Sequence, residues 1–277
     1  MSLEPVVDLL RCAHCARLVE LTDRVLRCSS GHAFDLARQG YVNLTGAAQP
    51  GHADTAAMIT ARAELLTSGR YDQVRAALIA AVPARAVDLL DVGTGTGWYA
   101  AGVLAARPGA RCLGLDVSVA ACRRAARAHP RLGVVTADAW GRLPVAERSL
   151  DAVLSVFAPR RPADLARVLR PDGAVLTVTA APDHLAELRA PLGLLTVEAG
   201  KDQRLLQSMA GAGFHKIAEH VVRRQAPWTA EDAIRSVAMG PNAFHATTAE
   251  VTRRAERLSW PLPVTISCLL ARWSRSG

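Results

Sequence analysis

The chain contains 277 residues, of which 50% are hydrophobic and 21% are charged. These values are typical of a globular protein and exclude a disordered or fibrous architecture for most of the length. The sequence has no apolar run near the roughly 18 residues of a membrane-spanning helix, and no secretory signal at its N-terminus. We therefore expect a cytoplasmic protein with no membrane partner, built as one large domain or two unequal ones.

The formal net charge of +8 comes almost entirely from arginine, because Lys201 and Lys216 are the only lysines. A guanidinium group offers a planar fork suited to phosphates, although a GC-rich genome would produce the same bias. The low aromatic content of 4% speaks against a broad base-stacking surface. Five arginines near the N-terminus either line a phosphate-binding face or form a solvated surface: Arg11, Arg17, Arg24, Arg27 and Arg38.

The first predicted feature along the chain is a metal site. Three cysteines and a histidine are spaced as two metal-binding knuckles: Cys12, Cys15, Cys28 and His32. Four protein ligands would close a tetrahedral site, which predicts a structural Zn²⁺ in a zinc ribbon with a short strand over 25–27. Gly31 permits the sharp turn of the second knuckle, and His14 is expected to face solvent. The alternative is three unrelated buried thiols and a surface histidine.

The next predicted elements are helices over 54–68 and 71–82, after a segment at 46–53 that we expect to be a linker or mobile loop. From residue 87 onward strands and helices alternate. The predicted strands cover 87–92, 111–116, 134–138, 151–156 and 174–179, and the helices cover 98–106, 118–129 and 161–169. Two late strands, 216–225 and 264–272, are expected to form a final antiparallel pair. This alternation predicts an α/β fold with a doubly wound parallel sheet.

A glycine-rich loop follows the first strand of the alternating region. Asp91 ends that strand, and Gly93, Gly95 and Gly97 lead into the next helix. Such glycines let the backbone approach a ligand at the carboxyl edge of the sheet. A dinucleotide fingerprint would place a third close-packing glycine where this chain has Trp98, so the pattern favours S-adenosylmethionine.

Two further acids stand at the ends of the following strands. Asp116 can accept hydrogen bonds from both ribose hydroxyls, and Asp138, with Ala139 beside it, can meet the exocyclic amine of adenine. Acids at strand ends also cap the helices that follow them, so one alone would decide nothing. Three acids around one glycine loop indicate a cofactor site.

Over essentially the whole chain, the sequence resembles the bacterial 23S rRNA guanine-N1 methyltransferases, which include the tylosin-resistance enzymes. The resemblance rests on the zinc pattern joined to Gly40-Tyr-Val-Asn-Leu44, and on segments that include Asp116-Val-Ser118 and Phe157-Ala-Pro159. It extends over these further segments: Asp54, Met58, Ala61-Arg62, Leu66, Gly69-x-Tyr71, Asp91–Gly97, Leu169–Gly173, His184-Leu-x-Glu-Leu188 and Met239–His245.

The resemblance implies a class I S-adenosylmethionine-dependent methyltransferase preceded by a small zinc ribbon. We expect a zinc-ribbon RNA-recognition module at 1–36, a linker and helical segment at 37–84 and the methyltransferase domain at 85–277. The implied product is N1-methylguanine in a 23S rRNA hairpin, with macrolide resistance as the biological role and a homodimer as a further expectation. Tyr71 joins the cofactor-binding residues, and Phe157 is expected to stack on an extruded guanine rather than serve only as a core residue.

Guanine N1 carries a proton that must leave, so a general base is expected. The candidates are His245, which we place in the catalytic set, and Asp183 and His184; each also has a purely structural explanation. Two other functions remain open. A small-molecule methyltransferase of secondary metabolism would have the same cofactor residues but little need for a zinc module. A non-catalytic RNA-binding protein would not need an intact glycine loop.

Overall fold

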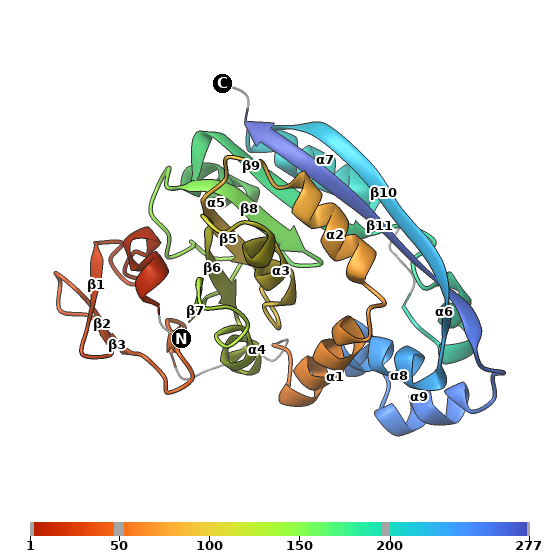
Figure 1. Ribbon diagram of the computed structural model, residues 1–277. Helices are drawn as coiled ribbons and strands as arrows, with labels where there is room; N and C mark the ends of the chain where they lie inside the picture. The colour runs from red at the N-terminus through yellow and green to blue at the C-terminus, as the bar shows by residue number, and fades with distance from the viewer. Residues whose placement is uncertain (1–2, 47–52, 196–199, 276–277) are drawn as a thin grey trace.

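The computed structural model describes residues 3–46, 53–195 and 200–275 (Figure 1). The predicted linker at 46–53 lies, apart from its ends, outside these ranges. None of the helices within the described ranges is long and apolar enough to cross a membrane.

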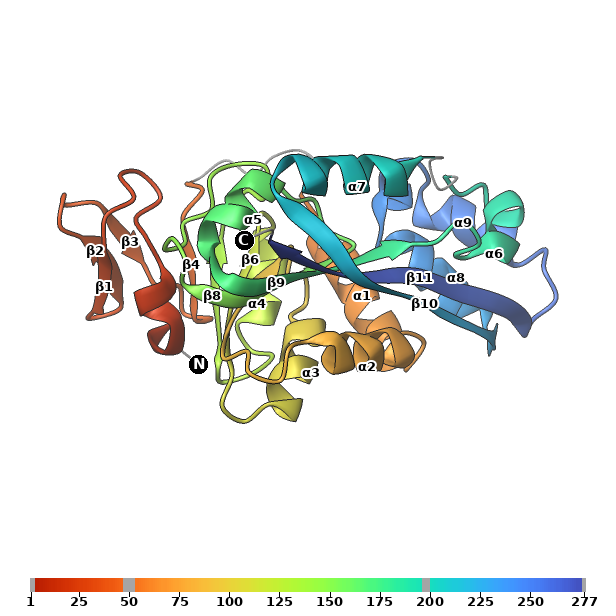
Figure 2. The ribbon, with the colours of Figure 1, turned by 90° about the horizontal axis from the view of Figure 1, so that it is seen from above.

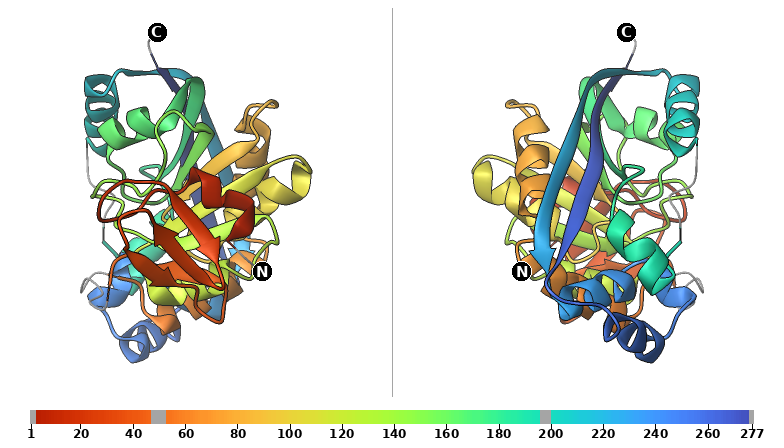
Figure 3. Two further views of the ribbon diagram at one scale, coloured as in Figure 1. Left: turned by 90° about the vertical axis from the view of Figure 1, so that its left-hand side faces the viewer. Right: turned by 90° about the vertical axis from the view of Figure 1, so that its right-hand side faces the viewer.

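The N-terminal part forms a small unit of its own secondary structure. A 3₁₀ helix, η1 (Glu4–Leu9), precedes an antiparallel sheet of β1 (Val19–Thr22), β2 (Val25–Cys28) and β3 (Ala33–Asp35). Figure 1 shows this unit at one end of the molecule, and Figure 3 (left) views the molecule from that end. The strand predicted at 25–27 is therefore confirmed as the central strand of the ribbon.

The main sheet of the described residues has eight strands in the order β10-β11-β9-β8-β5-β6-β7-β4. The strands β9, β8, β5, β6, β7 and β4 run parallel, whereas β11 is antiparallel to both β9 and β10. Their bounds are β4 Tyr41–Asn43, β5 Asp88–Val92, β6 Arg111–Asp116, β7 Leu132–Thr136, β8 Leu150–Val156, β9 Leu169–Ala180, β10 Phe214–Trp228 and β11 Leu262–Arg275. The predicted doubly wound sheet with a final antiparallel pair is confirmed.

Helices cover both faces of this sheet, as Figure 2 shows for α2 and α3 on one side and α5 and α7 on the other. One apolar core joins the sheet to α1, α2, α3, α4, α6, α8 and α9, and the second joins it to α5, α7 and the N-terminal unit. The bounds are α1 Ala56–Thr67, α2 Asp72–Ala81, α3 Trp98–Ala106, α4 Val119–Ala125, α5 Pro162–Val168, α6 Ala186–Leu192, α7 Lys201–Gly211, α8 Ala230–Ala238, η2 Pro241–Phe244 and α9 Thr248–Ala255.

Several helix and strand boundaries in the structure differ from the predicted ones. The helix predicted over 118–129 ends at Ala125 and continues as turns. The strand predicted at 134–138 lies two residues earlier, so Asp138 belongs to the loop. The strand predicted at 174–179 begins earlier, at Leu169, and its first residues include Pro171-Asp-Gly173, where the register with β8 shifts. The 37–84 range, expected to hold a linker and helices, also contains β4, which pairs with β7.

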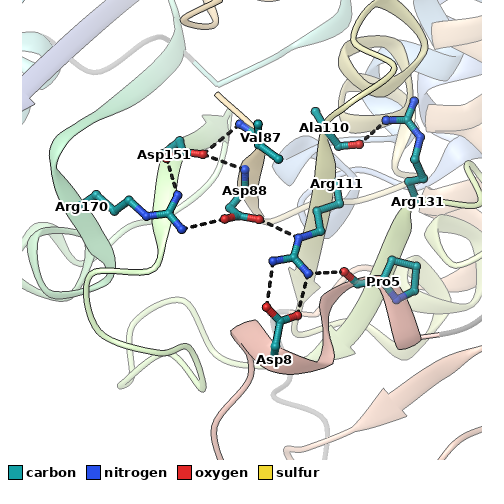
Figure 4. A network of polar contacts seen from close by, with 9 residues as sticks. All are labelled: Pro5, Asp8, Val87, Asp88, Ala110, Arg111, Arg131, Asp151 and Arg170. Atoms are coloured by element: carbon teal, nitrogen blue, oxygen red, sulfur yellow. Dashed lines mark hydrogen bonds and ion pairs between the residues drawn. The ribbon is translucent and has the colours of Figure 1, made fainter. Parts of the chain in front are cut away.

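The N-terminal unit is joined to the sheet by a buried interface and a polar network. The side chain of Val6 packs over Gly133 of β7, where a Cβ atom would lie 2.3 Å from Val6 Cγ2. Arg111, at the start of β6, contacts both Asp8 of η1 and Asp88 of β5 (Figure 4). The zinc-ribbon end is thus fixed at the amino edge of the parallel strands, opposite the edge that carries the glycine loop.

Candidate zinc and cofactor sites

The four predicted metal ligands converge at one point. Their ligand atoms all lie within 4.8 Å of one another. His32 Nδ1 is 3.5 Å from Cys12 Sγ and 3.4 Å from Cys28 Sγ, and Cys15 Sγ is 3.7 Å from Cys28 Sγ. A tetrahedral Zn²⁺ site has edges of about 3.8 Å between two sulfurs and about 3.5 Å between sulfur and nitrogen. The donor set and its spacing therefore fit zinc, with His32 binding through Nδ1.

Backbone hydrogen bonds shape both knuckles. The N–H of Ala16 donates to the carbonyl of Cys12, and that of Gly31 donates to the carbonyl of Cys28. Gly31 has a φ of +86°, as the predicted sharp turn requires. The Arg17 backbone N–H lowers the pKa of Cys15 to about 6, which favours the thiolate that a metal needs. His14 is exposed, as predicted, and its ring stacks on Phe34.

The glycine loop between β5 and α3 has the close-approach geometry that the sequence predicted. Gly93, Gly95 and Gly97 have φ values of +69°, +54° and +75°, all in the left-handed region. A Cβ atom on Gly93 would lie 2.5 Å from the Cβ of Ala158, so the loop also packs against the segment after β8. The loop therefore needs glycine both for its backbone conformation and for its contact with that segment.

Asp91 lies beneath this loop, only 2% exposed. Its carboxylate accepts a hydrogen bond from Thr94 Oγ1 at 2.8 Å. Burial raises the pKa of Asp91 to about 7, a second effect being the nearby charge of Asp116. A bound cation would favour the ionised form, and S-adenosylmethionine is such a cation.

Asp116 links β6 to the glycine loop. One carboxylate oxygen accepts the N–H of Gly95 at 2.9 Å, and the other accepts the N–H of Ser118, also at 2.9 Å. Burial raises the pKa of this carboxyl. Each oxygen retains a lone pair, so the group has the acceptor capacity that a ribose diol requires.

Asp138 and Ala139 lie in the loop after the neighbouring strand β7. Asp138 is exposed, and its Oδ1 accepts the N–H of Trp140. Ala139 is buried, whereas the Trp140 side chain is 62% exposed. The structure thus brings the third acid to the same carboxyl edge of the sheet as Asp91 and Asp116, and its contact with adenine remains a prediction.

Phe157, Tyr71 and His184 form an aromatic cluster after the end of β8. The ring of Phe157 lies edge-on to Tyr71 at 6.3 Å and is 44% exposed. Its φ of +53° is unusual for a bulky residue and turns the chain sharply at this edge. Tyr71 is buried with its hydroxyl 3.3 Å from His184 Nε2, so it lies beside Phe157, the residue predicted to stack on the base.

Two arginines near the loop were not among the predicted site residues. Arg62 of α1 forms a 2.6 Å ion pair with Asp54, donates to the carbonyl of Met239, and would lie 3.2 Å from a Cβ atom on Gly95. Arg160 donates to Ser155 Oγ and to the carbonyl of Ala158, and burial lowers its pKa to about 10. No spacing signal connects residues 62, 95 and 239, because only the tertiary fold brings them together.

The three general-base candidates lie in different surroundings. His184 Nδ1 accepts the N–H of Ser267, and burial lowers the pKa of the ring to about 4. Asp183 forms an ion pair with Arg223 at 2.8 Å. His245 directly follows η2 and is exposed. Its side chain forms no hydrogen bond, ion pair or ring contact with the other described residues. The segment that carries His245 begins near the glycine loop, because Arg62, which lies beside Gly95, donates to the carbonyl of Met239.

The fold and the cofactor loop define a class I S-adenosylmethionine-dependent methyltransferase. A family model for a methyltransferase domain matches residues 89–173. A zinc-ribbon model described as "RlmA, N-terminal" matches residues 10–49. A solved structure of a Bacillus halodurans C-125 protein assigned as a methyltransferase has a TM-score of 0.51 and 20% identity, covering 72% of this chain and 97% of its own, and shows the shared fold.

Relatives that span both parts of the chain identify the family. The 23S rRNA (guanine(748)-N(1))-methyltransferase of Streptomyces fradiae is 43% identical over 95% of this chain and 95% of its own. A Micromonospora griseorubida protein assigned as a 23S rRNA (guanine-N(1)-)-methyltransferase is 44% identical over 95% of this chain and 96% of its own. The chain belongs to the 23S rRNA (guanine-N1)-methyltransferase family.

Proposed function

We propose that this chain transfers the methyl group of S-adenosylmethionine to N1 of a guanine in 23S rRNA. The observation that carries the proposal is the joining of a complete zinc ribbon to an intact cofactor loop, in the arrangement shared with relatives named for this reaction. In this proposal Asp116 binds the ribose, Asp138 and Ala139 meet the adenine, and the loop of Gly93, Gly95 and Gly97 encloses the amino-acid end.

The methyl transfer itself needs little covalent chemistry from the protein. When bound, S-adenosylmethionine would supply an electrophilic methyl group, whose carbon–sulfur bond would break with its electron pair left on sulfur while N1, as it loses its proton, forms the new bond. The residues of this chain would hold the methyl group and N1 in line, because such a transfer needs its reacting atoms about 3 Å apart. In this proposal Phe157 stacks on the guanine, and Arg160 supports the turn at Phe157 through its hydrogen bonds to Ser155 and to the carbonyl of Ala158.

The N1 proton must leave as the bond forms. His184 is a poor acceptor because its Nδ1 accepts a backbone N–H, and Asp183 is neutralised by Arg223. The side chain of His245 has no partner among the described residues, so it is free to accept a proton. We therefore keep His245 as the proposed base, acting once the RNA is bound. Positioning and exclusion of water supply most of the acceleration in this proposal.

The proposal includes an RNA hairpin as the recognised element, a cytoplasmic location, and macrolide resistance as the consequence of the modification. The homodimer stays a prediction. The rival small-molecule methyltransferase keeps the same cofactor residues, but it offers no role for a zinc ribbon whose core is continuous with the sheet.

The decisive experiment is incubation of the zinc-loaded protein with methyl-labelled S-adenosylmethionine and either undermethylated ribosomal RNA or a whole-cell small-molecule extract. We expect label in 23S rRNA at guanine N1, seen as a block to reverse transcription. Label in small molecules alone would support the rival enzyme, and cofactor binding without transfer would support the non-catalytic protein.

The role of His245 needs a separate measurement. The single-turnover methylation rate of His245→Asn is measured across pH. We expect its pH profile to lack the fall in rate at low pH that depends on the general base. The same profile in wild type and variant would remove His245 from the proposal and leave proton loss to solvent.

A further inference from the structure

A groove with an unusual lining lies between α1, α3 and α4. Its volume is about 540 Å³. Ile59 of α1 and Trp98 of α3 contribute apolar surface, and three threonines also line the groove: Thr60, Thr67 and Thr96. The hydroxyls of Thr60 and Thr67 donate to the carbonyls of Ala56 and Ala63 within α1. The remaining wall is basic, formed by Arg123 and Arg124 of α4 and by Arg127 just after it.

These three arginines are exposed, and their guanidinium groups form no hydrogen bond or ion pair with the other described residues. Many arginines elsewhere are held by carboxylates or carbonyls, as Arg62, Arg111 and Arg167 are. The lining that the structure describes contains no aspartate or glutamate. The groove therefore concentrates uncompensated positive charge beside hydroxyl and apolar groups.

The groove is continuous with the cofactor loop. Thr96 lies between Gly95 and Gly97, and Trp98 is the first residue of α3. A further cation lies close by, because Arg75 Cζ is 3.9 Å from the centroid of the Trp98 ring. Anything bound along the arginines thus lies next to the loop proposed to hold the methyl donor.

We propose that this groove binds the sugar–phosphate backbone of the RNA substrate, with Arg123, Arg124 and Arg127 on the phosphates. The inference rests on the proposed function, since it presumes an RNA substrate. Arginine forks are the groups that proteins use most on phosphate oxygens, and apolar side chains accommodate sugars and bases. A protein partner would need several carboxylates at matching positions to pair with the three arginines, whereas RNA carries a phosphate at every nucleotide.

The test measures binding of a 23S rRNA hairpin transcript to the zinc-loaded full chain between about 50 and 300 mM salt. The variant R123Q/R127Q removes two charges from one side of the groove. The matched variant R85Q/R148Q removes two exposed charges at the amino edge of the sheet, and R123K/R127K keeps the charge in the groove. Thermal unfolding and S-adenosylmethionine affinity are measured for each, and both are expected to stay at the wild-type values.

We expect R123Q/R127Q to bind the transcript at least tenfold more weakly near 100 mM salt, with the log–log salt slope smaller by about 1.4 to 1.8 units. R85Q/R148Q and R123K/R127K should keep nearly the wild-type slope. If R123Q/R127Q behaves as wild type does, or loses no more than R85Q/R148Q, the groove does not bind RNA. A wild-type protein that neither binds nor methylates any 23S rRNA would instead overturn the proposed function.

Discussion

Arg111 donates hydrogen bonds to both carboxylate oxygens of Asp8, at 2.7 and 2.8 Å. The same guanidinium donates from Nε to Asp88 at 2.6 Å and from Nη1 to the carbonyl of Pro5 at 2.7 Å. One side chain on β6 thus joins η1 to β5, and Figure 4 shows the network continuing through Arg170 to Asp151. Because η1 leads directly into the first zinc knuckle, this contact fixes the ribbon relative to the cofactor domain.

Replacing Arg111 by Leu should lower the free energy of unfolding by about 1 to 3 kcal/mol, because it leaves the largely buried Asp88 with one cation instead of two. Urea unfolding at pH 7 measures this. The control is Arg142→Leu, which breaks an exposed pair with Glu147 and should change the free energy by less than about 0.5 kcal/mol. Equal effects of the two variants would show that the network does not stabilise the docked ribbon.

Asp91 should make both stability and cofactor affinity depend on pH. Its pKa is about 7 in the folded chain and 3.8 as the ordinary value, so the folded state holds the proton more tightly. Stability therefore falls as pH rises from about 4 to 7, by about 4 kcal/mol in all, and then levels off. Affinity for the cationic cofactor should rise over pH 6–8, as Asp91 ionises.

Asp91→Asn tests this, because an amide oxygen can still accept the Thr94 hydrogen bond without carrying charge. The variant should be more stable than wild type at pH 8, and its cofactor affinity should be weaker and nearly independent of pH. Calorimetric titration and urea unfolding at pH 5 and pH 8 provide both quantities. Unchanged pH dependence in Asp91→Asn would assign the titration to another group.

Gly93→Ala should abolish most cofactor binding. The new Cβ atom would lie 2.5 Å from the Cβ of Ala158, and φ is +69°, so the loop or the segment after β8 must move. Gly213→Ala is the matched control, since its φ is +81° but its Cβ atom would meet nothing within 4 Å. We expect Gly213→Ala to cost about 1 kcal/mol of stability with unchanged affinity. Comparable affinities of the two variants would mean that the close contact between position 93 and Ala158 does not limit cofactor binding.

Zinc removal should unfold the ribbon and weaken the rest of the chain. The sheet of the ribbon contributes few buried residues, so the metal would hold the two knuckles together. Leu26, Cys12 and Cys28 belong to the apolar core that also contains residues of η1, so the effect would extend beyond the ribbon. A chelator, or Cys15→Ser, is expected to lower the melting temperature and release one zinc per chain. Cys112→Ser is the control for loss of a buried thiol outside the ribbon. Retention of zinc by Cys15→Ser would exclude Cys15 as a ligand.

Most of the sheet and both sites follow from local signals in the sequence. The spacing of Cys12, Cys15, Cys28 and His32 specifies a metal site because a knuckle is a turn of few residues. The glycine loop and Asp116 are likewise set by the ends of adjacent parallel strands, which must meet at one edge. Apolar runs such as 87–92 and 151–156 predict buried strands for the same reason.

The features that escaped prediction depend on long-range packing. β4 has only three residues, and its place in the sheet is set by β7 about ninety residues away. Arg62 reaches the glycine loop and Met239 through α1, and no periodicity reports such a contact. His184 and Glu187 belong to one recognised segment, yet Glu187 binds Thr265 of β11 while His184 faces Tyr71. Only the fold separates their roles.

The last prediction concerns His184, which should position Tyr71 and not accept the N1 proton. Because Nδ1 accepts the N–H of Ser267, the neutral ring carries its proton on Nε2, 3.3 Å from the Tyr71 hydroxyl. Burial lowers the pKa of the ring to about 4, so it stays neutral during methylation at pH 6–9. His184→Gln keeps a donor toward Tyr71, so it should retain most of the single-turnover rate and the shape of its pH profile, whereas Tyr71→Phe, which removes the positioned hydroxyl, should lower the rate. A profile that loses its acidic limb only in His184→Gln would make His184 the base and shift the proton path away from His245.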